Sequence, residues 1–133
     1  MRTLLIALVL FSAAPVMAAN DLRGNVTITP ALLKKVSPTD TLFIFAQAAR
    51  GPKMPLAIVR LQAKDLPASF TLNDSMAMAP AFRLSNFKQV NVIARVSKSG
   101  KAVPSIGDLQ GIVKAVSVGT SKKIAVQINE IIK

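Results

Sequence analysis

The sequence contains no cysteine, no histidine, no tryptophan and no tyrosine. The missing cysteine excludes disulfides, thiol redox chemistry and cysteine nucleophiles. The missing histidine excludes Ser-His-Asp catalysis, and the two absences together exclude blue-copper centres and most zinc sites. The fold must therefore be held together by a hydrophobic core without covalent cross-links.

Acidic side chains are also scarce, with 6 Asp and Glu against 17 Lys and Arg, and the formal net charge is +11. The six carboxylates are scattered, so no sequence pattern pairs two of them for acid and base catalysis. Ser85 and Lys88 match the Ser-x-x-Lys spacing of penicillin-recognising enzymes, but the match lies in an expected loop and is a chance one. These features favour a non-enzymatic protein without a cofactor.

The first 18 residues have the composition of a removable secretory signal. A basic residue at position 2 precedes an apolar run from Leu4 to Phe11, and small residues lead to Ala18. The run is too short to span a bilayer, which needs about 20 apolar residues. We expect cleavage after Ala18 and a periplasmic or secreted mature chain, residues 19–133, that forms a single domain.

Because Arg2 is the one basic residue in this signal, the mature chain of 115 residues would keep 16 Lys and Arg against 6 Asp and Glu, a formal charge of +10. Such a charge speeds encounters with anionic partners but does not determine the fold. An exported protein rarely meets nucleic acid, so we expect no nucleic-acid partner. Proteins, anionic lipids and acidic polysaccharides remain as classes of partner.

The spacing of apolar residues predicts an all-β domain. The apolar run 41–46 predicts a central strand that is covered on both faces, and Leu56, Ile58 and Arg60 are expected to share one face of the next strand. The remaining expected strands are 24–29, 69–72, 90–97, 109–116 and 122–132. About seven strands at this spacing predict a Greek-key β-sandwich of the immunoglobulin-like or cupredoxin-like kind.

Turn and helix signals place the connections between these strands. Thr29 and Pro30 can begin a short helix that ends before Pro38. Residues 98–101 have the composition of a hairpin turn. The irregular segment 76–87 predicts a long connection from one sheet to the other, and residues 123–129 alternate as an edge strand does.

Seven short segments, in order and at matching spacing, resemble the C-terminal immunoglobulin-like domain of the c-type cytochrome biogenesis proteins called CycH or CcmI. They span residues 24–132, nearly the whole mature chain. The segments are Phe43-Ile44-Phe45-Ala46, Gly51-Pro52-x-Met54-Pro55-Leu56-Ala57, Leu66-Pro67-x-x-Phe70-x-Leu72, Met76-Ala77-Met78-x-Pro80, Leu84-Ser85-x-Phe87, Ala94-Arg95-Val96-Ser97-Lys98-Ser99-Gly100 and Gly107-Asp108-Leu109-x-Gly111.

The resemblance implies a periplasmic β-sandwich that serves haem attachment. Full-length members of the family resemble membrane-anchored proteins whose tetratricopeptide helices hold unfolded apocytochrome c. The matching segments belong to the last domain alone, so we expect a stand-alone exported domain, and capture of apocytochrome in the family's manner does not carry over.

Three methionines, Met54, Met76 and Met78, are candidate functional residues. If Met76 and Met78 lie on one strand, their thioethers share a face, and Met54 could join them in a soft Cu(I) site. Haem ligation by a methionine is a second alternative. Methionine more commonly fills gaps in a core or lines an adaptable binding surface, and no His or Cys supports a metal here.

We therefore carry two hypotheses. The first is a non-enzymatic accessory domain that binds a protein or peptide, either an apocytochrome c segment added to a sheet edge or a component of the haem-ligation assembly. The second is a carrier of copper, haem or another small ligand that uses the methionines. The candidate partner-binding residues combine basic and methionine side chains, namely Lys53, Met54, Arg60, Met76, Met78, Arg83, Arg95 and Lys98.

Overall fold

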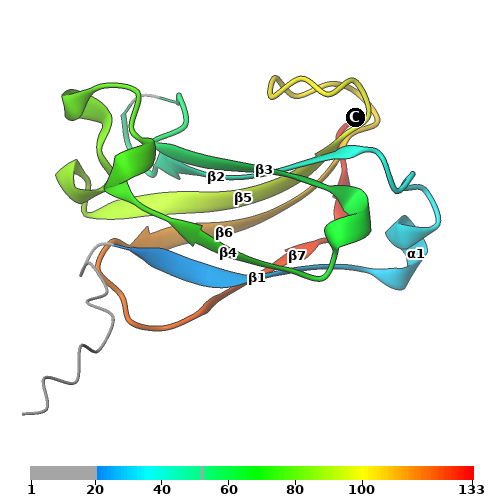
Figure 1. Cartoon of the computed structure of the whole chain (residues 1–133), viewed down its shortest axis with the longest axis horizontal. Helices are drawn as coiled ribbons and strands as arrows, with labels where there is room; N and C mark the ends of the chain where they lie inside the picture. The colour runs from blue at the N-terminus through cyan, green and yellow to red at the C-terminus, as the bar shows by residue number, and fades with distance from the viewer. Residues whose placement is uncertain (1–20, 52) are drawn as a thin grey trace, which may run out of the picture.

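The computed structural model describes residues 21–51 and 53–133, so the expected signal, residues 1–18, lies outside the described residues. The described chain forms two packed β-sheets, which confirms the predicted all-β sandwich (Figure 1). The elements are β1 (Leu22–Ile28), α1 (Pro30–Leu33), β2 (Thr41–Ala48), β3 (Ala57–Gln62), β4 (Ala68–Leu72), β5 (Gln89–Ser97), β6 (Leu109–Ser117), β7 (Ile124–Ile128) and β8 (Glu130–Ile131), with four 3-10 helices, η1 (Ala63–Asp65), η2 (Asp74–Met76), η3 (Pro80–Phe82) and η4 (Leu84–Asn86).

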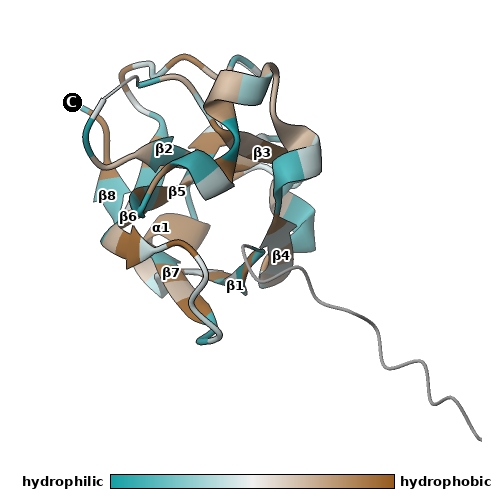
Figure 2. Ribbon diagram, turned by 90° about the vertical axis from the view of Figure 1, so that its left-hand side faces the viewer, coloured by the Kyte–Doolittle hydropathy of each residue, from teal (hydrophilic) through white to brown (hydrophobic). Residues whose placement is uncertain are grey.

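The larger sheet has the strand order β3-β2-β5-β6-β8, with antiparallel neighbours throughout. The smaller sheet has the order β4-β1-β7, in which β1 pairs antiparallel with β4 and parallel with β7. Figure 2 shows the two sheets as facing layers, seen from the end that carries η2 to η4. Strands β1 and β7, from opposite ends of the described chain, are therefore neighbours.

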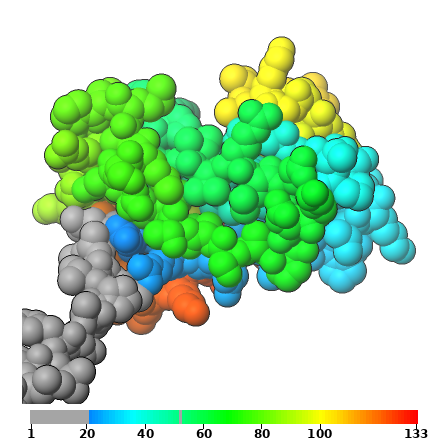
Figure 3. Space-filling model, viewed as in Figure 1, coloured from blue at the N-terminus to red at the C-terminus, as the bar shows by residue number. Residues whose placement is uncertain are grey.

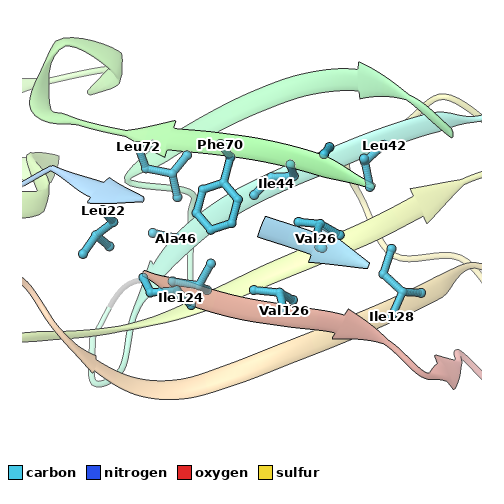
Figure 4. Close-up of a cluster of buried hydrophobic side chains, with 14 of the residues drawn as sticks. Leu22, Val26, Leu42, Ile44, Ala46, Phe70, Leu72, Ile124, Val126 and Ile128 are labelled. Carbon is cyan, nitrogen blue, oxygen red and sulfur yellow. The ribbon is translucent and has the colours of Figure 1, made fainter. Parts of the chain in front are cut away.

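The main core lies between the two sheets because alternate residues of each strand point inward. Leu42, Ile44 and Ala46 of β2 face side chains of the smaller sheet, and all three are fully buried (Figure 4). From the smaller sheet, Leu22, Val26, Phe70, Leu72, Ile124, Val126 and Ile128 complete this layer. The alternation of 24–29 and 123–129 in the sequence reflects this single buried face.

Two glycines allow close backbone approaches, one within the smaller sheet and one between the two sheets. A Cβ at Gly24 of β1 would overlap the backbone carbonyl of Ile124 in the neighbouring strand. A Cβ at Gly111 of β6 would overlap the carbonyl of Gln127 in β7, which belongs to the other sheet. Backbone approaches of this kind require the absence of a side chain.

The C-terminal segment differs from the single expected strand 122–132. It divides at Asn129, whose amide donates to the carbonyl oxygen of Gln110 at 3.2 Å. Residues before this point form β7, an edge strand of the smaller sheet as predicted, and residues after it form β8, which pairs with β6 of the larger sheet. The tail thus crosses between sheets and adds an eighth strand.

Other predictions require smaller corrections. Leu56 precedes β3 and lies fully buried in the main core, whereas Ile58 packs on the opposite face of the larger sheet, so the two do not share a face. The expected turn 98–101 is the start of an 11-residue loop, residues 98–108, between β5 and β6. The long connection 76–87 does cross from β4 of the smaller sheet to β5 of the larger, as predicted.

Candidate functional site

The outward side of the larger sheet carries an apolar row, whereas an outward sheet face is usually polar. Strand pairing aligns Ile58, Phe45, Ile93 and Ile112 across β3, β2, β5 and β6. Phe45 and Ile93 are buried and form, with Phe43, a second apolar cluster apart from the main core. We call this side, defined by these five residues, the outer face.

Two arginines lie over the aromatic rings of the outer face. In the strand pairing Phe43 stands between Arg60 of β3 and Arg95 of β5. The Cζ atom of Arg60 is 5.8 Å from the centroid of the Phe43 ring, and that of Arg95 is 5.2 Å from the centroid of the Phe45 ring. Both distances are within the range of cation–π attraction, so each guanidinium is held over an aromatic ring of the outer face.

Arg95 joins the outer face to the loop 98–108. Its side chain is only 5% exposed. Nη1 donates to the carbonyl oxygen of Ala102 at 2.9 Å, while Nε and Nη2 donate to Oε1 of Gln110 at 3.4 and 3.3 Å. Burial lowers the pKa of Arg95 and the charge of Asp108 raises it in part, but a guanidinium remains charged in proteins.

Asp108 holds the other end of the same loop. It is 2% exposed, and its carboxylate accepts hydrogen bonds from the backbone amides of Ser105 at 3.0 Å and Lys98 at 3.4 Å. The hydroxyl of Ser97 donates to the carbonyl oxygen of Lys101 at 2.9 Å. The loop is therefore fixed by Arg95 and Ser97 of β5 and by its own Asp108 rather than by its apolar residues.

The tip of this loop nevertheless presents apolar side chains to solvent. Val103 is 70% exposed and Ile106 is 85% exposed. Figure 3 shows the loop, in yellow, standing out from the body of the molecule. Among the residues that the structure describes, six large hydrophobic side chains are exposed, and four of them lie on this loop, β6 or β8. Exposed apolar side chains such as Val103 and Ile106, three residues apart on one loop, are features of interaction surfaces.

A hollow of about 230 Å³ lies between this loop and the segment before β3. Gln47 Nε2 donates to the carbonyl oxygen of Lys53 at 2.8 Å and so ties that segment to β2. The lining is mainly apolar and contains no acidic residue. Its members are Phe45, Gln47, Lys53, Pro55, Ile58, Arg95, Ala102, Val103 and Pro104.

The structure distributes the predicted partner-binding residues over several places. Lys53 and Arg95 line this hollow, and Arg60 lies beside Phe43 on the same face. Lys98 instead donates to the carbonyl oxygen of Lys35 at 2.7 Å and pairs with Asp40 at 3.2 Å, so it ties the loop after β5 to the segment after α1.

Met76 and Met78 do not lie on one strand, so the premise that their thioethers share a strand face is wrong. Met76 ends η2 and packs against the main core, while Met78 follows it outside any strand and is 77% exposed. Met54 is half-buried in the segment before β3, and Arg83 is exposed between η3 and η4. Within the described residues no group of three His, Cys, Asp or Glu could hold a metal ion.

The partner-binding residues predicted from the sequence do not include the apolar side chains of the outer face and of the loop 98–108. The prediction that 41–46 is covered on both faces is confirmed, and its outward residues Phe43 and Phe45 are the floor of the outer face. What covers Phe45 is not foreseen, because the predicted hairpin turn takes in only residues 98–101 of the loop 98–108. The signal that could have found it is Val103, Pro104 and Ile106, an apolar group within an expected polar loop.

A wider hollow, about 520 Å³, opens where β2 ends and β5 begins. Its two cations, Arg50 and Lys88, are exposed, and Phe87 is half-buried beside them. No buried polar side chain points into it, so it offers less to a partner than the outer face. No helix in the described part of the chain is both long and apolar enough to cross a membrane.

Comparison with known proteins places this geometry in a family. The family profile described as the cytochrome c-type biogenesis protein H Ig-like domain matches residues 22–129. The chain is 42% identical over 117 residues to the cytochrome c-type biogenesis protein CycH of Pseudomonas aeruginosa. That alignment covers 88% of this chain but 28% of the relative, so the chain spans under a third of that protein. No solved structure matches the chain.

Proposed function

Because this chain belongs to the family of the cytochrome c-type biogenesis protein H Ig-like domain, we propose that it is a non-catalytic accessory domain of c-type cytochrome biogenesis. In this proposal it works in the periplasm and binds a protein or peptide. The partner is an apocytochrome c segment or a component of the haem-ligation assembly.

The observation that carries the proposal is the outer face. It combines aromatic side chains with two arginines that lie over their rings, and the exposed apolar tip of the loop 98–108 lies beside it. Such mixtures of aromatic and Arg residues are typical of interface centres. The described chain forms only two salt bridges, Arg23 with Asp21 and Lys98 with Asp40. Lys53 and Arg60 therefore keep their charges available to a partner.

The proposal is tested by site-specific photo-crosslinking in a bacterium that assembles c-type cytochromes. A photoreactive amino acid is placed at Val103, in the loop beside the outer face, or, as the matched control, at Leu33, which is 53% exposed on α1. We expect position 103, and not position 33, to form an adduct with apocytochrome c or a haem-ligation component. Mass spectrometry identifies the adduct, and the absence of both proteins at position 103 contradicts the proposal.

A loss-of-binding variant makes the same test quantitative. Val103→Glu places a carboxylate at the apolar tip of the loop, where Val103 is 70% exposed and little structural cost is expected. We expect the partner adduct formed from a second position, Ile112 of the outer face, to fall by about ten-fold, the loss produced by roughly 1.4 kcal/mol of binding energy. Leu33→Glu is expected to leave that adduct unchanged.

A further inference from the structure

The geometry of the hollow points to a particular chemistry of ligand, and we propose that it binds an apolar side chain whose neighbours in an extended peptide are acidic. The apolar side chain enters the hollow above Phe45 and Ile58, and the adjacent carboxylate meets the ammonium group of Lys53. This inference rests on the proposed function and names the class of peptide that the outer face would recognise.

The size of the hollow favours a side chain over a cofactor. At about 230 Å³ it falls below the roughly 300–1,000 Å³ typical of sites for cofactors and drug-sized molecules. A haem or a nucleotide would stand mostly outside it. One Phe, Leu or Met side chain is of a scale that such a hollow can enclose.

Both walls of the hollow are fixed before any ligand arrives. Gln47 holds the backbone at Lys53 on one side, at 2.8 Å, and Arg95 holds the backbone at Ala102 on the other, at 2.9 Å. Pro55 and Pro104 stiffen the same two walls because proline fixes its own backbone torsion. Little ordering is left to oppose binding, so even a short peptide can gain from the contact.

Charge selects the neighbours of that side chain. The lining includes two cations and no acid, and Arg95 already donates to Ala102 and Gln110. Lys53 forms no salt bridge with a described carboxylate and is exposed, so it is the cation left for a ligand. Strand pairing aligns Glu130 with Arg95 through Gln110, but Glu130 lies two strands away and does not line the hollow.

The same charge disfavours a second copy of this chain as the occupant. The sequence has a formal net charge of +11, so two copies repel at low salt. An acidic and apolar segment of another protein matches both the field around the hollow and its lining. The occupant is therefore such a segment rather than a dimer partner.

The test compares three heptapeptides by NMR titration of the isotope-labelled full chain in 50 mM NaCl. Their sequences are Gly-Ser-Glu-Phe-Glu-Ser-Gly, the basic analogue Gly-Ser-Lys-Phe-Lys-Ser-Gly, and Gly-Ser-Glu-Ala-Glu-Ser-Gly, which lacks the apolar side chain. We expect the first to bind about ten-fold more tightly than either of the others. Its shift changes should concentrate at the amides of Lys53, Ala102 and Val103.

Matched variants separate the two parts of the ligand. Lys53→Gln should weaken the acidic Phe peptide by about three-fold, as expected for an exposed ion pair, while Lys64→Gln removes the same charge from η1 and should change nothing. Val103→Ser should weaken the Phe peptide and leave the Ala peptide unchanged. Leu33→Ser removes another exposed apolar side chain, from α1, and is the control.

Three results would overturn the inference: equal affinity for the acidic and basic peptides, no response to Lys53→Gln, or shift changes away from the hollow. Tighter binding to phosphatidylglycerol vesicles than to the acidic Phe peptide would assign the outer face to a membrane and also overturn it. Crosslinks from Val103 to a biogenesis component with no peptide selectivity would leave the proposed function standing alone. Selective peptide binding without those crosslinks would support the peptide inference and contradict the proposed function.

Discussion

At the scale of single residues, Arg95 has the largest number of roles. It lies over Phe45, bonds to Gln110 within the sheet, and holds the loop 98–108 through Ala102. A buried cation with several acceptors is costly to remove because its partners lose their donors together. The outer face depends on this residue for its shape, in addition to any contact with a partner.

We predict that Arg95→Leu lowers the free energy of unfolding by about 1.5–3 kcal/mol, the range for charged hydrogen bonds. Urea unfolding measures the loss, and hydrogen exchange should accelerate at the amide of Lys101 and the residues after it. Arg95→Lys should recover part of the stability because an ammonium group can reach only one of the two acceptors. A loss below about 0.5 kcal/mol, the range of ordinary surface substitutions, would show that the loop is held by other contacts.

Gly24 supports a second prediction at this scale. An added Cβ would overlap the carbonyl of Ile124 and touch the ring of Phe70, and a backbone carbonyl cannot move aside without disturbing the pairing of β1 with β7. Gly24→Ala should therefore cost at least about 2–3 kcal/mol of unfolding free energy.

Gln127→Ala in the neighbouring strand is the control for Gly24→Ala. The Gln127 side chain is exposed, so its removal should change stability by less than about 0.5 kcal/mol. Thermal unfolding of the two variants side by side decides the matter. Equal midpoints would mean that the small sheet can relax around an added methyl group.

Part of the site could be predicted from residue types, and part could not. Basic residues were expected to meet a partner, and strand pairing does place Arg60 and Arg95 on one face. Lys53 lies before β3 and lines the hollow on the same side, where Gln47 holds its carbonyl. The methionines were grouped on the assumption of a strand, which fails because a 3-10 helix intervenes. Proximity between loops depends on long-range packing that no local pattern records.

At the scale of elements, the short strand β8 is small but well connected. The amide of Ile132 donates to the carbonyl oxygen of Asp108, and the amide of Gly107 donates to that of Ile132, both at 2.8 Å. β8 also pairs with β6 at Leu109 and Gln110. These bonds connect the end of the loop 98–108 to the tail of the chain.

Deleting residues 130–133 should therefore lower the free energy of unfolding by about 1–3 kcal/mol, the net loss expected when a few backbone hydrogen bonds are replaced by bonds to water. The amide of Gly107 should lose its protection from hydrogen exchange, while amides of β2 keep theirs. Removal of Lys133 alone is the control and should have no effect. Unchanged protection at Gly107 would contradict the role given to β8.

Strand positions were predictable because a buried face leaves a periodic pattern. The central place of β2 followed from its unbroken apolar run, and the long crossing 76–87 followed from the loss of any period. The division of the last segment at Asn129 was not predictable, since Ile132 continues the alternation of Ile124, Val126 and Ile128 in the sequence. The structure nevertheless pairs Ile128 with β1 of the smaller sheet and Ile131 with β6 of the larger sheet. The sheet that a strand joins depends on pairing with strands far away in the sequence, which a local pattern does not contain.

At the scale of the whole molecule, the excess of positive charge opposes compactness. The formal net charge of +11 is spread over a small domain, and only two salt bridges offset it within residues 21–51 and 53–133. Salt screens this repulsion, with a Debye length of about 10 Å at 0.1 M.

We predict that the unfolding midpoint at pH 7 rises by about 4 °C between 10 and 200 mM NaCl, which corresponds to roughly 1 kcal/mol for a domain of this size. Calorimetry measures the shift. A neutral solute at equal osmolality should produce a smaller rise. A midpoint that falls with salt would mean that attractive ion pairs, rather than repulsion, dominate the folded state.

The parallel pairing of β1 with β7 has a consequence for how the chain is made. Val26 pairs with Val126, so one hundred residues of synthesis separate the two partners. At roughly 5–20 residues per second a ribosome needs about 5–20 s to cover that distance. Throughout that interval β1 keeps an unsatisfied edge, and the nascent chain must be shielded from aggregation until β7 emerges.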